Sequence, residues 1–152
     1  CGISDANSSE FSQTKKNPVI DLLPNQDLEA DDVGASMRLG TYPCKIQPDT
    51  MAKDIYNNEI IYERHRHRYE VNNKFRNELE SKGLVFSGLS PDEDLVEMIE
   101  LKDHPYFVAS QFHPEFKSRP WDPAPMFNSF IAASKEIKFF DENVKDEHKV
   151  KD

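Results

Sequence analysis

The chain has 152 residues, a length that fits one compact domain or part of a larger one. Hydrophobic residues make up 37% of the sequence, charged residues make up 31%, and the formal net charge is −9. This acidic balance argues against a nucleic-acid surface, because phosphate binding needs clustered lysine and arginine. The apolar runs fall short of the roughly 20 residues of a membrane helix, and no pattern suggests secretion. The sequence therefore predicts a protein that binds neither nucleic acid nor membrane.

The sequence contains two cysteines, Cys1 and Cys44. One pair does not make a disulfide framework, so we expect a reduced, cytoplasmic setting. The first residue is a cysteine rather than a methionine, and no helix cap or leader pattern accompanies it. We interpret this start as a truncation and expect the natural chain to extend upstream.

The predicted elements are strands interspersed with short helices. Residues 1–36 are mostly loop-like, apart from an apolar segment over 19–23 that Pro24 ends. Alternating or short apolar runs predict strands over 37–46, 60–69, 84–88, 95–101 and 106–112. Helices are predicted from Thr50 through Tyr56, from Asn72 to a stop at Gly83, and from Pro123 or Pro125 to Ile137. The domain is expected to span 1–138, and the charged residues 139–152 are expected to form a disordered tail.

The apolar strand over 106–112 leads into His113 and Glu115. Residues at i and i+2 of an extended backbone point the same way, so both side chains would leave the strand on one side. A carboxylate that accepts from one ring nitrogen fixes the histidine tautomer, and the other nitrogen can then take a proton from a nucleophile. The pattern equally fits a strand-end histidine that pairs with a surface carboxylate.

The second feature is a basic segment, ERHRHRYE, over residues 63–70. Alternation would place its arginines on one side of a strand, namely Arg64, Arg66 and Arg68, and would place His65, His67 and Tyr69 on the other side. The arginines could clamp a carboxylate or phosphate, because a guanidinium offers two parallel donors. A solvated or salt-bridged strand face fits the same pattern. A metal site at the two histidines is disfavoured, since guanidinium groups repel a divalent cation and no Cys or Asp joins at ligand spacing.

A nucleophile for the histidine–carboxylate pair is not found in this sequence. A nucleophilic thiol needs a sharp strand-to-helix elbow, with backbone N–H groups that form an oxyanion hole. Cys1 has no preceding residues to build the elbow, and Cys44 lies inside a predicted strand, where a small buried thiol is expected. The residues alone thus indicate half of an active site.

Four segments together resemble the C-terminal glutaminase domain of the CTP synthase family. They are ANSSEF (6–11), MRLG (37–40), ERHRHRYEVN (63–72) and QFHPEFKSRP (111–120). Their order and approximate spacing agree with that family, and the resemblance covers nearly all of residues 3–137. It implies an α/β fold with three layers, a mainly parallel central sheet and helices on both faces. This chain would supply the C-terminal part of such a class I glutamine amidotransferase domain.

The resemblance also implies roles for four residues. His113 would be the general base of a Cys-His-Glu triad, and Glu115 would orient it. Glu10 would help to hold the bound glutamine, and Arg68 would clamp its α-carboxylate. The Cys elbow, the oxyanion-hole glycines and the N-terminal synthetase domain of the family are missing, and Ala35 stands where the family usually has a glycine. We therefore expect the chain alone to be inactive.

In the full enzyme, the resemblance implies that ammonia released from glutamine aminates UTP to CTP in an ATP-dependent reaction. ATP, magnesium and UTP would bind in the missing synthetase domain, this chain would need no cofactor, and the full-length enzyme would be a homotetramer. The alternative is a non-catalytic module with the same fold that binds an anion or a partner protein through the basic strand. The sequence upstream of Cys1 would separate these hypotheses.

Overall fold

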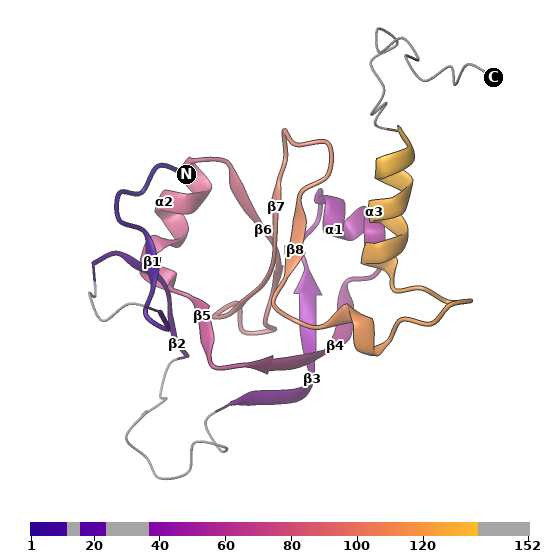
Figure 1. Cartoon of the computed structure of the whole chain (residues 1–152), viewed down its shortest axis with the longest axis horizontal. Helices are drawn as coiled ribbons and strands as arrows, with labels where there is room; N and C mark the ends of the chain where they lie inside the picture. The colour runs from indigo at the N-terminus through magenta and orange to yellow at the C-terminus, as the bar shows by residue number, and fades with distance from the viewer. Residues whose placement is uncertain (12–15, 24–36, 137–152) are drawn as a thin grey trace, which may run out of the picture.

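The computed structural model describes residues 1–11, 16–23 and 37–136 of the chain (Figure 1). Its strands are β1 Asn7–Ser8, β2 Pro18–Leu22, β3 Arg38–Ile46, β4 Ile60–His67, β5 Tyr69–Val71, β6 Leu84–Leu89, β7 Val96–Leu101 and β8 Val108–Ser110. Its helices are α1 Met51–Tyr56, α2 Arg76–Ser81 and α3 Pro125–Glu136, with short 3-10 turns at η1 Asn73–Phe75 and η2 Pro114–Phe116. The predicted strands and helices are confirmed to within a few residues. The predicted tail at 139–152, the boundary at 138 and Ala35 lie outside the described residues.

The strands form two sheets. The five-stranded sheet has the order β4-β3-β6-β7-β8, and the three-stranded sheet has the order β1-β2-β5. All pairings in the five-stranded sheet are antiparallel, and among the described strands only β1 and β2 pair in parallel. The mainly parallel sheet that the resemblance implied is therefore not confirmed for this part of the chain. The physical reason is that β6, β7 and β8 follow one another through short connections, whereas a parallel pair needs a crossover of about a dozen residues or more.

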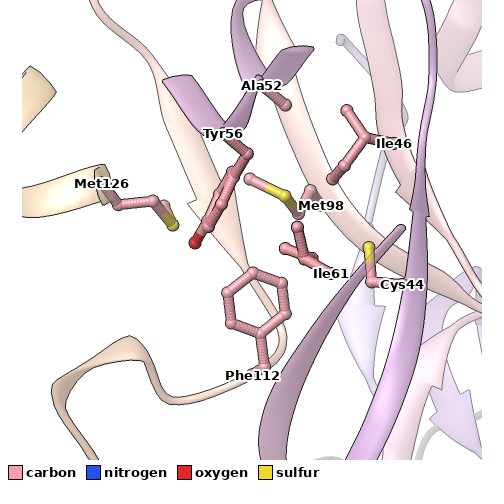
Figure 2. Packing of buried hydrophobic residues seen from close by; sticks show 8 residues of the cluster. All are labelled: Cys44, Ile46, Ala52, Tyr56, Ile61, Met98, Phe112 and Met126. Atoms are coloured by element: carbon pink, nitrogen blue, oxygen red, sulfur yellow. The ribbon is translucent and has the colours of Figure 1, made fainter. Parts of the chain in front are cut away.

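Both faces of the five-stranded sheet are covered (Figure 1). Met98 and Ile99 are neighbours in β7 and point to opposite faces, and each belongs to a different core. On the face with α1 and α3 the core consists of Cys44, Ile46, Ala52, Tyr56, Ile61, Met98, Phe112 and Met126 (Figure 2). On the face with α2 and the small sheet the buried residues are Leu79, Phe86, Leu89 and Val96. The result is an α/β arrangement, and none of the described helices is long and apolar enough to cross a membrane.

Helix α1 begins where two side chains bind its first backbone N–H groups. Thr50 Oγ1 accepts from Lys53 N at 3.1 Å, and the buried carboxylate of Glu100 accepts from Met51 N and Ala52 N at 2.9 and 3.0 Å. A carboxylate is favoured there because a helix N-terminus carries unpaired donors and partial positive charge. Glu100 belongs to β7, so this cap ties α1 to the sheet.

Gly88 in β6 lies against the core without room for a side chain. A Cβ at this position would lie 2.7 Å from Cys44 Sγ and 2.9 Å from Met98 Cγ. We expect Gly88→Ala to lower the free energy of unfolding by about 1–3 kcal/mol, because the packed core has to shift. Urea or thermal unfolding measures this loss. In a Cys44→Ala background the substitution should cost less, and an equal cost in both backgrounds would contradict the role of the sulfur contact.

Candidate functional site

His113 and Glu115 lie in the turn that follows β8. The strand ends at Ser110, and η2 begins directly after His113. His113 Nδ1 lies 2.8 Å from Glu115 Oε1. The two side chains meet as predicted, but the reason given by strand alternation is wrong, because a 3-10 turn and not an extended backbone brings them together.

Hydrogen bonds, a cation–π contact and an ion pair between Lys117 and Glu63 hold this turn against β4. His113 N donates to Arg64 O at 2.9 Å, and Lys117 Nζ donates to Tyr62 O at 2.7 Å. The Arg64 guanidinium lies over the Phe116 ring, 5.3 Å from its centroid, in a cation–π contact. Both ends of the turn are thus attached to one strand, which gives the His113 side chain a rigid support.

The contact with Glu115 determines which nitrogen of His113 is available. A carboxylate only accepts, so Nδ1 of the neutral ring donates to it and Nε2 keeps its lone pair. A backbone N–H and the His113 ring lower the pKa of Glu115, which therefore stays ionised. The His113 side chain is 40% exposed, so a substrate or nucleophile can approach it from solvent. The arrangement is that of a general base with an orienting acid.

The basic segment follows the predicted alternation only in its first part. In β4, Glu63 and His65 are buried, whereas Arg64 and Arg66 are exposed. The strand ends one residue before Arg68, which is half-buried at a bend between β4 and β5. The prediction of three arginines in one row is therefore wrong for Arg68. This bend separates Arg68 from the exposed arginines Arg64 and Arg66.

Arg68 connects the two regions that carry the other predicted site residues. Leu23 N donates to Arg68 O at 2.9 Å, next to the pairing of β2 with β5. Glu10 is exposed just beyond β1, and β1 pairs with β2 in the same small sheet. On the other side, the His113 turn is bound to Arg64 on the strand that leads into Arg68. The roles of Glu10 and Arg68 in binding glutamine remain predictions.

A buried polar cluster lies on the inner face of β4. Its members, which are at most 9% exposed, are Arg38, His65, His67, Glu70 and Glu97. Arg38 Nη1 lies 2.5 Å from Glu97 Oε1, and His65 Nδ1 lies 3.5 Å from Glu97 Oε2. Sequence reasoning missed Arg38 and Glu97, because they come from distant strands. The signal that could have found them was a glutamate inside the apolar alternation of residues 95–101.

Among the described residues, His65, His67 and Glu97 form a group that could surround a cation, because their ligand atoms lie within 4.8 Å of one another. The Arg38 guanidinium, however, already pairs with Glu97 and would repel a divalent cation. Burial, reinforced by Arg38, lowers the pKa of His65 to about 3 and that of His67 to about 4. Both rings are therefore neutral at pH 7. We still expect no metal in this cluster, although the repelling arginine is Arg38 and not a neighbour in the basic segment.

Glu70 makes the stability of the protein depend on pH. Burial raises its pKa to about 8, from 4.5 for the free side chain; Glu97 adds to this rise, and the Val71 N–H and Arg38 oppose it. Between these two pH values the folded state holds a proton that the unfolded state has lost. The stability that this group contributes is therefore complete below pH 4.5 and falls as the pH rises towards 8.

We expect Glu70→Gln to raise the free energy of unfolding by about 1–2 kcal/mol at pH 8 and to have little effect at about pH 5. The amide is neutral, so it avoids the ionisation of a buried acid at high pH. Thermal unfolding of both forms at the two pH values measures the difference. An equal effect at both pH values would contradict the raised pKa.

Cys44 is inert. It is fully buried in the core, and burial raises the pKa of its thiol to about 12, so the thiol stays protonated. The small buried thiol predicted from the sequence is confirmed. Cys1 is exposed at the first described residue. Among the described residues, His113 and Glu115 form a pair that could act as a base with an orienting acid, and the buried Cys44 thiol is not available to it.

The chain matches the family model "Glutamine amidotransferase class-I" over residues 18–133. It is 60% identical over 137 residues to the CTP synthase of Caldanaerobacter subterraneus subsp. tengcongensis, a match that covers 90% of this chain and 25% of that protein. It is 58% identical over 135 residues to the CTP synthase of Bacillus subtilis, covering 89% of this chain and 25% of that protein. The chain therefore spans about a quarter of the length of the curated relatives it matches.

A solved structure of the Trypanosoma brucei CTPS glutaminase domain with bound acivicin has a similar fold. The TM-score is 0.78 at 37% sequence identity. The match covers 91% of this chain and 54% of that chain. The fold described above is thus similar to about half of that glutaminase domain.

Proposed function

This chain belongs to the class I glutamine amidotransferase family, and we propose that it forms the glutamine-hydrolysing part of a CTP synthase. The observation that carries the proposal is the 2.8 Å contact between His113 Nδ1 and Glu115 Oε1, which leaves Nε2 available as a base. The identity of about 60% to CTP synthases supports this choice within the family. The nucleophilic cysteine, the oxyanion hole and the parallel strands of the domain would lie outside this sequence. For that reason we expect the chain alone to be inactive.

In the proposed reaction, His113 moves a proton in both halves. Nε2 first takes the proton of a cysteine thiol, and the thiolate attacks the side-chain amide carbon of glutamine. The C–N bond breaks, the proton passes to the leaving ammonia, and a glutamyl thioester remains. Water then attacks the thioester while His113 takes its proton, and this proton returns to the sulfur as glutamate leaves. Glu115 stays ionised and stabilises the imidazolium in each half.

Two further residues would bind the substrate. Arg68 would hold the α-carboxylate of glutamine through parallel N–H donors, and Glu10 would help to hold the bound glutamine. The ammonia would then aminate UTP in an ATP-dependent reaction. ATP, magnesium and UTP would bind in the synthetase domain of the whole enzyme, which we expect to be a cytoplasmic homotetramer.

We expect His113→Ala, in the full-length protein, to lower glutamine-dependent CTP formation by about a hundredfold or more, the usual contribution of a general base. CTP formation from added ammonia should persist, because ammonia bypasses glutamine hydrolysis. Steady-state rates with each nitrogen source provide the test and its internal control. An equal fall in both rates would mean that His113 is not the base. Two unchanged rates would favour the non-catalytic binding module.

We expect Arg68→Ala to raise the KM for glutamine by about ten- to a hundredfold, because a charged clamp for the carboxylate is lost. The turnover rate at saturating glutamine should fall much less, since the His113–Glu115 pair remains. Arg66→Ala is the matched control, because Arg66 is exposed two residues earlier on β4. An unchanged KM in Arg68→Ala, or the same change in Arg66→Ala, would contradict the clamp.

A further inference from the structure

The side chain of Gln111 joins two parts of the proposed glutamine site. Gln111 lies in the loop after β8, two residues before His113. Its Nε2 donates to Tyr69 O at 3.1 Å, and its backbone N donates to Glu97 O at 2.8 Å. The backbone of Gln111 is thus bound to β7, and its side-chain amide is bound to Tyr69, the residue after Arg68.

The Tyr69 carbonyl also accepts from a buried ring. His67 Nδ1 lies 3.0 Å from Tyr69 O, and because a carbonyl only accepts, this nitrogen carries the proton. His67 Nε2 then accepts from His65 Nδ1 at 3.1 Å. The preceding carbonyl, that of Arg68, accepts from Leu23 N at 2.9 Å. Two consecutive carbonyls at the bend are therefore held by donors from three separate segments.

The surroundings of Gln111 favour this bond. Gln111 lines a pocket of about 170 Å³ whose walls are mainly apolar, with Ile20 and Ile99 among them, although Glu97 and Ser110 also line it. Apolar walls offer an amide few alternative partners, and an unpaired amide in such a place is unfavourable. The Tyr69 carbonyl is the partner that the structure provides.

We infer that Gln111 and His67 are positioning residues that set the separation between His113, the base, and Arg68, the carboxylate clamp. The inference rests on the proposed function. Gln111 couples the loop that carries His113 to the backbone that carries Arg68, and His67 fixes the same carbonyl from β4. A bound glutamine has to reach from the clamp to the base. A shift of the loop relative to the bend would therefore displace the substrate amide from the reacting atoms.

The first test removes the amide donor of Gln111 in the full-length enzyme. Gln111→Met keeps a similar size and shape, and we expect the KM for glutamine to rise about three- to tenfold, the range for one lost hydrogen bond. The turnover rate at saturating glutamine should fall by a similar factor, because the base is displaced from the bound amide, whereas the ammonia-dependent rate and the melting temperature should stay near wild type. Gln47→Met is the matched control, because Gln47 Nε2 is also buried but has no hydrogen-bond partner among the described residues.

The second test uses His67, for which two amides mimic different ring nitrogens. In His67→Asn the amide nitrogen can take the place of Nδ1 and donate to Tyr69 O, whereas in His67→Gln it takes the place of Nε2. We expect the KM for glutamine to stay near wild type in His67→Asn and to rise about three- to tenfold in His67→Gln. If His67 only stabilised the fold, the KM for glutamine would not rise in His67→Gln while staying near wild type in His67→Asn.

Three results would overturn the inference. The first is that Gln111→Met shows the same glutamine kinetics as Gln47→Met. The second is that the turnover rate and the melting temperature of Gln111→Met fall together. The third is that His67→Asn and His67→Gln change the KM for glutamine equally. His113→Ala is assayed in the same series. If it still uses glutamine, the proposed function itself fails; if it does not and Gln111→Met behaves as wild type, only the positioning role fails.

Discussion

The hydrogen bond from His113 N to Arg64 O is the contact on which the arrangement of the site depends. β4 is an edge strand of the five-stranded sheet, so backbone groups along its outer edge can bind a loop. Tyr62 and Arg64 are two residues apart, and their carbonyls accept from Lys117 and His113. An open edge strand is a hazard for aggregation in many proteins. Here the edge binds the turn of the same chain, and the turn acquires a rigid support.

Two buried acids beside the basic segment, Glu63 on β4 and Glu97 on β7, each have a cationic partner. Burial raises the pKa of Glu63, and Lys117, whose Nζ lies 3.5 Å from Glu63 Oε1, lowers it. Glu97 pairs with Arg38 in the same way on the inner side. Such pairs add little net stability compared with apolar residues, but removal of one partner leaves a buried charge. Because Lys117 belongs to the turn, its contact with Glu63 favours the state in which the turn is bound to β4.

Local patterns in the sequence predicted the elements well and the contacts between them poorly. The alternation of residues 60–67 and the Thr50 cap are set by neighbours in the chain, so periodicity and capping rules could identify them. The bend at Arg68 and the 3-10 turn after His113 could not be read in this way, because each is fixed by bonds to distant residues, Leu23 for the first and Arg64 for the second. The same holds for Arg38 with Glu97 and for Gln111 with Tyr69. The resemblance, in contrast, singled out His113, Glu115 and Arg68 without explaining how they are held.

The basic segment serves three sets of contacts at once, and this explains why its sequence is so distinctive. Its buried face needs His65 beside Glu97, its exposed face places Arg64 over Phe116, and its backbone edge binds the His113 turn. A change on either face therefore alters the strand that also leads into Arg68. The proposed base and the proposed clamp thus share one support. A thiol that came within reach of Nε2 would therefore meet a ring that is already held in place.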